Sequence, residues 1–518
     1  KAAELLAKLA GSMPAVEEAL SLLKLDTNLK KMGLPPVKMS RVEGPAKGEP
    51  TVAVLAPASI YKLAIAQEGG RQAPGDVHLV LDPSWLIQET WQDGGNRLFM
   101  TKGLYFDANG QAVIAAYDTP RPVRYFADFY TMGANDRSDG EPLEADLDVP
   151  MSNSLQLEKV TNDKLLTRLL LAAKGVGVPA TLAFLMAAHP LKDATSAPLM
   201  RIEAMPEARE QVKGAIEGFL EQYPGAEVVV KPSGPQFHSG RGVKFFPRGD
   251  VDAMVEHVLA LKADGQMTPD GAVLVDGRLT PPALYLRHGE GETKAYLTSM
   301  NPMHVLTAAE LPGAKPKEKK DWNFRVLAAR TPWNGAVTTG IFARAGAWGV
   351  PTTAEPANPD DAAAVVSFED VVRALKQQHG LLQTKAEEAQ FRSDLEVMGA
   401  NAVLALAANE AKRERKDGEP PQSQTDYIGL DVMAEFEGGK LVPKVIEVND
   451  HDAGGQYQLD LFYPKQAGAH SREWVATMLQ RARQDALKGK RIVMVGAGYE
   501  GKRFIFERAK ELGVKITL

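Results

Sequence analysis

Two apolar runs rich in β-branched residues, 427–436 and 441–448, flank the pair Gly438-Gly439. This pattern predicts a β-hairpin, because two strand-forming segments joined by a glycine pair are typical of a tight turn. Glu447 and Asn449 end the second run two residues apart, so in a strand they share one face. An acidic hairpin facing solvent is the alternative, and Asn449 weakens it because asparagine is depleted in strands.

The register of this hairpin decides whether Asp431 joins the polar pair. A two-residue loop at Gly438-Gly439 pairs Asp431 with Ile446 and turns it away from Glu447. A three-residue loop through Lys440 pairs Asp431 with Glu447 directly. Two carboxylates opposed this closely repel each other unless a cation lies between them. Oxygen donors of this kind suit Mg²⁺, which keeps waters and takes further ligands from phosphates.

A lysine stands in the first turn of a helix predicted from Lys164 to Lys174. Asn162 or Asp163 can cap this helix and Gly175 ends it. A lysine at the positive end of a helix is unfavourable unless an anion is bound there. The alternative is an exposed lysine without a ligand.

A second lysine, Lys231, ends the apolar strand 226–231 and precedes a loop rich in glycine and serine. Backbone N–H groups in such loops hold phosphate oxygens, although the spacing is not that of a P-loop and a plain hairpin loop is the alternative. The candidate binding residues of this loop are Ser233, Gly234, Ser239, Gly240 and Gly242. The next buried strand, 271–276, ends in Asp276.

Three arginines follow in a β-rich region, Arg325, Arg330 and Arg344. A guanidinium in this region can reach a transferred phosphate or a substrate carboxylate. Each arginine taken alone is more typical of an ordinary surface position.

Composition narrows the class of protein. A chain of 518 residues predicts about three domains, and 44% hydrophobic residues suffice for real cores. The net charge of −6 argues against a dedicated nucleic-acid binder, and the absence of cysteine excludes disulfides and thiolate metal sites. The longest apolar stretch, 165–185, is interrupted by lysine, glycine and proline, so we expect no membrane span. We expect a cytoplasmic protein, and its first residue, Lys1, suggests an excised piece.

Residues 491–504 contain a strand, a Gly-x-Gly-x-x-Gly motif over Gly496 to Gly501, and the start of a helix. This motif is typical of dinucleotide-binding domains, which makes a nicotinamide-dependent oxidoreductase a rival hypothesis. The acid expected about 20 residues later is missing because the chain stops at Leu518. We therefore expect the start of a truncated further module.

In their order along the chain, Asp163-Lys164, Val-Val-Lys231-Pro-Ser-Gly, Val-Leu-Val-Asp276 and Asp431 with Glu447-Val-Asn449 resemble the ATP-grasp superfamily of carboxylate–amine ligases. The resemblance implies that Lys164 and Lys231 contact ATP phosphates and that Asp276 lies in the hinge that receives adenosine. It also implies that Asp431, Glu447 and Asn449 hold Mg²⁺, with Mn²⁺ as a substitute. His451 stands where many members carry an arginine, and a histidine is a weaker, pH-dependent phosphate partner.

The resemblance implies an α/β (α+β) chain with an ATP-grasp fold, a preceding Rossmann-like domain and an incomplete α/β start at the carboxy terminus. The expected segments are a helical segment and linker (1–49), an α/β domain (50–155), a nucleotide-binding lobe (156–285), a metal and substrate lobe (286–487) and the truncated module (488–518).

The implied reaction is ATP-dependent joining of a carboxylate, such as that of β-alanine, to an amine, such as histidine, through an acyl phosphate. The implied partners are these amino-acid substrates, a carboxy-terminal ATP-grasp module of the same chain and, as an option, a second copy in a homo-oligomer; nucleic acid and membranes are not expected. The alternative is a catalytically weak or inactive nucleotide-binding module that supports the carboxy-terminal one.

Overall fold

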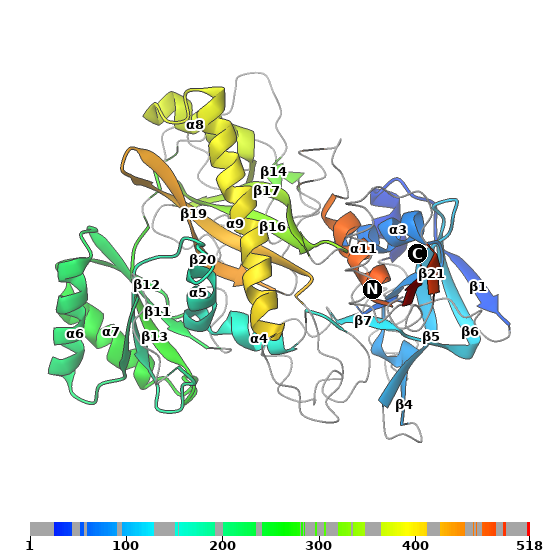
Figure 1. Cartoon of the computed structure of the whole chain (residues 1–518), viewed down its shortest axis with the longest axis horizontal. Coiled ribbons are helices and arrows are strands. Elements are labelled where there is room, and N and C mark those ends of the chain that lie inside the picture. The colour runs from blue at the N-terminus through cyan, green and yellow to red at the C-terminus, as the bar shows by residue number, and fades with distance from the viewer. Residues whose placement is uncertain are drawn as a thin grey trace, which may run out of the picture.

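A computed structural model gives the fold of the chain (Figure 1). The structure describes residues 25–43, 52–55, 60–90, 96–128, 151–153, 155–191, 200–234, 241–279, 320–332, 335–347, 364–411, 425–450 and 469–482, with short pieces at 281–282, 284, 296–297, 305–306, 459, 463, 491–493 and 515–517.

The first lobe is a mixed five-stranded sheet in the order β10-β9-β13-β11-β12. Its strands are β9 (Thr181–Leu185), β10 (Met200–Ala204), β11 (Glu227–Ser233), β12 (Lys244–Pro247) and β13 (Ala272–Gly277). Helices α6 (Arg209–Gln222) and α7 (Val251–Lys262) pack apolar side chains on one face of this sheet. Lys231 follows the apolar run of β11, two residues before the strand ends at Ser233, and is partly buried.

The second lobe is an antiparallel sheet in the order β18-β17-β16-β19-β20. Its strands are β16 (Lys320–Arg330), β17 (Ala336–Ala347), β18 (Ala364–Ser367), β19 (Tyr427–Glu437) and β20 (Lys440–Asn449). Helices α8 (Phe368–His379) and α9 (Lys385–Ala411) lie on one face and bury alternate strand residues, among them Trp322, Phe324 and Val326. The intervening residues of β16 therefore point to the opposite face.

Helix α5 (Lys164–Ala172) joins the two lobes, and α4 (Leu155–Asn162) precedes it. Figure 1 shows α5 between the first-lobe sheet and α9, beside β20. The Asp163 carboxylate caps α5 by accepting from the backbone N–H groups of Leu165 and Leu166 at 3.1 and 3.0 Å. Beyond the helix, the N–H of Val445 in β20 donates to the Gly177 carbonyl at 2.8 Å. The segment that follows the carboxyl end of α5 is thus held against the second-lobe sheet.

The amino-terminal domain is a mixed sheet in the order β1-β6-β5-β3-β2-β7-β8, with β4 paired to β5. Its elements are β1 (Lys38–Val42), β2 (Val52–Leu55), α3 (Ile60–Gln72), β3 (Val77–Val80), η2 (Pro83–Trp85), β4 (Leu86–Thr90), β5 (Asn96–Phe106), β6 (Ala112–Pro122), β7 (Tyr125–Asp128) and β8 (Met151–Ser152). Helix α11 (Ala469–Ala482) packs against α3 and against the second-lobe strands β16 and β17. The hydrophobic core of the amino-terminal domain therefore continues through α11 to these strands.

The α/β class predicted from the sequence is confirmed. Strands β3, β2 and β7 are parallel, but their sheet also contains antiparallel pairs, and a Rossmann-like domain over 50–155 stays a prediction. Short pairs form β14 (Tyr296–Leu297) with β15 (Val305–Leu306) and β21 (Arg491–Val493) with β22 (Lys515–Thr517). The glycine motif at Gly496 to Gly501 lies outside the described residues. Among the described helices, none combines the length and the apolar character that crossing a bilayer requires.

Candidate functional site

The hairpin of β19 and β20 combines features of both predicted registers. Glu437 pairs with Lys440 across a two-residue turn, in which Gly438 and Gly439 have φ values of 56° and 85°. Positive φ at both central positions is the conformation that favours glycine. A β-bulge then shifts the register between Asp431 and Val432, and Asp431 comes to lie opposite Glu447. The two-residue loop of one predicted alternative therefore occurs together with the Asp431–Glu447 pairing of the other.

Asp431 is fully buried and bound by two arginines. Its Oδ1 accepts from Arg325 Nε at 2.9 Å and also from Arg344, and Asn449 Nδ2 lies 3.5 Å from its Oδ2. Burial raises the pKa of the Asp431 carboxyl, but the Arg325 and Arg344 guanidiniums outweigh burial and hold that pKa below its usual range. The carboxylate stays ionised, and its charge is met by guanidinium groups.

Glu447 is opposed by a lysine from α5. Lys164 Nζ lies 3.5 Å from Glu447 Oε1, and the two side chains are 14% and 30% exposed. The backbone N–H of Lys164 donates to Ser233 Oγ of β11 at 2.8 Å. The first residue of α5 therefore touches the first-lobe sheet through its backbone and the second-lobe hairpin through its side chain.

Lys231 lies over a buried carboxylate from the neighbouring strand. Its Nζ is 3.0 Å from Asp276 Oδ2. Arg168, one helical turn after Lys164, binds the same carboxylate with two nitrogens, at 2.5 and 2.8 Å. Burial, the Arg168 charge and the Lys164 charge lower the pKa of the Lys231 ammonium to about 8, although Asp276 opposes this. Lys231 is thus close enough to Lys164 for the Lys164 charge to lower its pKa.

These residues come from seven helices and strands. Their ion pairs form three groups: Lys164 with Glu447, Arg168 and Lys231 with Asp276, and Arg325 and Arg344 with Asp431. The Lys164 charge acts on Lys231 and the Glu447 charge acts on Arg325, so the three groups are treated as one charged cluster. Five cations and three carboxylates leave a net charge of +2, with the partly exposed Lys164 and Glu447 at its edge. A cluster of this charge favours a polyanionic ligand.

Several predicted site residues are placed differently from the expectation. The Asp276 carboxylate, expected in an adenosine hinge, is 4% exposed and is engaged by Arg168 and Lys231. In the glycine-rich loop, Gly234 follows β11 directly, and the Gly242 carbonyl lies 2.8 Å from His257 Nε2 of α7. Ser239, Gly240 and His451 lie outside the described residues.

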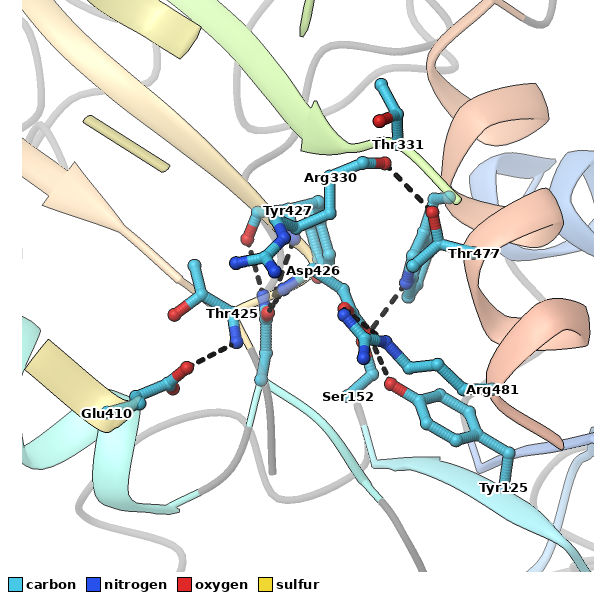
Figure 2. A network of polar contacts seen from close by, with 12 residues as sticks. Tyr125, Ser152, Arg330, Thr331, Glu410, Thr425, Asp426, Tyr427, Thr477 and Arg481 are labelled. Carbon is cyan, nitrogen blue, oxygen red and sulfur yellow. Dashed lines mark hydrogen bonds and ion pairs between the residues drawn. The ribbon is translucent and has the colours of Figure 1, made fainter. Parts of the chain in front are cut away.

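Arg330 does not join Arg325 and Arg344. Figure 2 shows it in a second polar network with Asp426, Thr425 and Glu410. Positions 325 and 330 are five residues apart in one strand, and an odd separation places side chains on opposite faces. The expectation that all three arginines share one site is therefore wrong for Arg330, which lies on the other face of β16 from Arg325.

Arg168 is not among the site residues predicted from the sequence. The signal was its spacing: residues i and i+4 lie on one face of a helix, so Arg168 shares the face of Lys164. Thr181 of β9 completes this part of the site, with its hydroxyl 2.9 Å from Asp276 Oδ1.

The donor set suits a magnesium ion that takes most of its ligands from elsewhere. No group of three or more histidines or acidic residues with metal-binding geometry occurs in the described part of the chain. Glu447 and Asn449 share a face of β20 as carboxylate and amide donors, which matches Mg²⁺ bound by few protein groups, waters and phosphates. Asp431 fits this role less well, because both arginines bind its Oδ1.

None of the protein-family models compared with the chain matches it. Among solved structures, D-cycloserine synthetase DcsG has a TM-score of 0.42 and 15% identity over 83% of this chain and 99% of that one. A RimK domain ATP-grasp protein from Sphaerobacter thermophilus has a TM-score of 0.37 and 14% identity over 83% of this chain and 98% of that one.

Curated relatives match at the level of sequence. Carnosine synthase 1 of Homo sapiens is 26% identical over 461 residues, which are 85% of this chain and 51% of that protein. Carnosine synthase 1 of Gallus gallus is 25% identical over 525 residues, 95% of this chain and 51% of that protein. The chain spans about half the length of these relatives. The run 445–452 followed by 496–504 predicts a similarity to such an enzyme, and the amino-terminal portion as the part that is matched stays a prediction. Over most of its length, the chain is a sequence relative of the carnosine synthases.

Proposed function

We propose that the chain is an ATP-grasp ligase that binds magnesium–ATP at the charged cluster and activates a carboxylate as an acyl phosphate. An amine then displaces phosphate and leaves an amide, with release of ADP and phosphate. The acid is an amino acid such as β-alanine and the amine is a compound such as histidine. The observation that carries the proposal is the convergence of Lys164, Lys231 and Glu447 from three separate elements.

The residues present suit phosphoryl transfer, in which the protein mainly positions groups and neutralises charge. Lys164 and Lys231 place two ammonium groups where negative charge would develop on phosphate oxygens. The positive end of α5, beside Lys164, adds to the same field. Glu447 and Asn449 would hold Mg²⁺, and the bound ion would screen the phosphate charge.

Arg325 of β16 and Arg344 of β17 lie beside the hairpin in the same sheet, on the side of Asp431 away from β20. Both side chains are less than 10% exposed, and both are oriented by the same carboxylate. We assign them to the carboxylate-substrate end of the site, because guanidinium groups held in this way recognise planar oxyanions.

A coupled assay of ADP release tests the proposal. The chain is incubated with Mg²⁺, ATP, β-alanine or another amino acid, and histidine as the acceptor. We expect ADP release that requires both amino acids and is lost in Lys231→Met, with thermal unfolding showing that this variant is folded. Amino-acid-independent ADP release, or equal rates in both proteins, contradicts a ligase that uses this cluster.

The second candidate is a nucleotide-binding module that supports catalysis elsewhere in a longer chain. The engagement of Asp431 by two arginines favours it, because a carboxylate expected to bind metal is then already neutralised. Binding of magnesium–ADP without any ADP release in the assay supports this candidate. A nicotinamide-dependent reaction rests on residues outside the described part of the chain, and titration with nicotinamide dinucleotides tests it.

A further inference from the structure

Arg168, Asp276 and Lys231 form a buried cluster with two cations and one carboxylate. Their side chains are 3%, 4% and 13% exposed. Arg168 contacts both oxygens of Asp276, Nη1 to Oδ1 at 2.5 Å and Nη2 to Oδ2 at 2.8 Å, whereas Lys231 contacts Oδ2 alone at 3.0 Å. The Thr181 hydroxyl also donates a hydrogen bond to Asp276 Oδ1. The carboxylate is thus largely committed to the guanidinium.

A buried positive charge without a full counter-charge is unfavourable in a protein interior. The cluster can relieve its surplus charge in two ways: Lys231 loses its proton, or an anion approaches Lys231. Arg168 cannot lose its proton at accessible pH, so the surplus falls on Lys231. Lys231 is also the most exposed of the three, and the Lys164 charge acts on it.

We propose that Arg168 is a positioning residue. Its guanidinium binds the Asp276 carboxylate, so that a nucleotide phosphate supplies the remaining counter-charge of the Lys231 ammonium. This inference deepens the proposed function and rests on it. Without Arg168, Asp276 would pair fully with Lys231 and hold it away from a ligand.

The proton affinity of Lys231 agrees with this geometry. The charged groups that face it are Arg168 and Lys164 of α5 and Asp276 of β13. Burial and the two cations lower its pKa to about 8, and Asp276 alone raises it. A lysine satisfied by a carboxylate would keep its pKa near the ordinary value or above it.

A purely structural role for Arg168 is the competing explanation, because the same contacts tie α5 to β13. The two roles differ in their effect on pH dependence. A tie between elements affects stability, whereas a charge beside Lys231 affects the pH at which an anionic ligand stops binding.

The test is calorimetric titration of the full 518-residue chain with ADP and Mg²⁺ from pH 7 to pH 9.5, for wild type, Arg168→Gln, Arg168→Lys and Asp276→Asn. Thermal unfolding is recorded for each protein. For wild type we expect affinity at pH 9 about tenfold below that at pH 7, because Lys231 loses its proton near pH 8. Arg168→Gln should bind more weakly at pH 7 and lose little further affinity up to pH 9.

Arg168→Lys keeps the charge but cannot contact both Asp276 oxygens as the guanidinium does, so its affinity at pH 7 should fall between those of wild type and Arg168→Gln. Asp276→Asn removes the carboxylate and should move the limit to lower pH, opposite to Arg168→Gln, so either variant tests the inference if the other does not fold. A folded Arg168→Gln or Asp276→Asn with the wild-type pH profile overturns it and leaves the nucleotide site in place. Absence of magnesium–ADP binding in wild type at every pH overturns the proposed function together with this inference.

Discussion

The Lys164 ammonium lies 3.5 Å from a carboxylate oxygen of Glu447, although 283 positions separate the two residues in the chain. Lys164 opens helix α5, and Glu447 is near the end of the last strand of the second lobe. Both side chains keep some exposure to solvent. An ion pair of this kind contributes little to folding, so a role in ligand binding explains the arrangement better.

Glu447→Gln is therefore expected to separate stability from function. Loss of a partly exposed ion pair should change the free energy of unfolding by less than about 1 kcal/mol. ATP turnover should be abolished, because the carboxylate proposed to hold Mg²⁺ is gone. Urea unfolding and ADP release measure the two effects, and substantial turnover in the folded variant would remove Glu447 from the metal site.

Asp431→Asn should behave in the opposite way. It leaves Arg325 and Arg344 buried without their carboxylate, and breaking a buried ion pair costs about 3–5 kcal/mol. Urea unfolding measures the loss, with Glu447→Gln from the same hairpin as the matched control. Equal stability of the two variants would show that the arginines do not depend on Asp431.

Ser233→Ala should weaken nucleotide binding through the position of α5. Ser233 Oγ accepts from the Lys164 N–H, and loss of such a bond costs about 1 kcal/mol. Ser367→Ala is the control, because Ser367 caps α8 by accepting from the Asp370 N–H at 3.1 Å. We expect similar losses of stability, but weaker binding of magnesium–ADP only in Ser233→Ala. Equal binding in both variants would contradict an anchoring role for Ser233.

Glu410 gives the chain a pH-dependent stability away from the nucleotide site. Its Oε2 accepts from the Thr425 N–H at 2.8 Å, and its Oε1 has no hydrogen-bond partner in the described structure (Figure 2). Burial and the Asp426 charge raise the pKa of the Glu410 carboxyl from 4.5 to about 7, despite the Thr425 bond and Arg330. Between these values the folded chain holds a proton that the unfolded chain has lost, so stability falls as pH rises from 4.5 to 7.

Glu410→Gln removes this penalty, because glutamine stays neutral. The stability gain over wild type should grow between pH 4.5 and pH 7 to about 3 kcal/mol and be constant above pH 8. Urea unfolding of both proteins at pH 4.5, 6 and 8 measures the difference. A gain that does not change with pH would show that Glu410 is ionised in the folded chain.

The sequence sufficed for the hairpin and for Lys164 in the first turn of its helix, because these follow from local patterns, whereas the length of the hairpin loop stayed open. The spacing of apolar residues in the sequence also indicates the bulge at Ile446. Val445 and Val448 are both buried in the same core, and an interval of three residues in a regular strand would place them on opposite faces. An extra residue between them restores both to the core and turns Glu447 toward Asp431.

The partners of Asp431 were beyond the reach of local patterns. They depend on which strands pair, and in which register: β16 lies beside β19 with Arg325 opposite Asp431, and β17 follows with Arg344. More than 80 residues separate these segments, and no spacing rule relates them. Arg330 differs, because the alternation of a strand already distinguishes it from Arg325.

The most direct test of the account is a crystal structure of the chain with Mg²⁺ and a non-hydrolysable ATP analogue. We expect phosphate oxygens within hydrogen-bonding distance of both the Lys164 and Lys231 ammonium groups, and the metal ion on Glu447. A nucleotide bound elsewhere, or phosphates that contact neither lysine, would contradict the central claim.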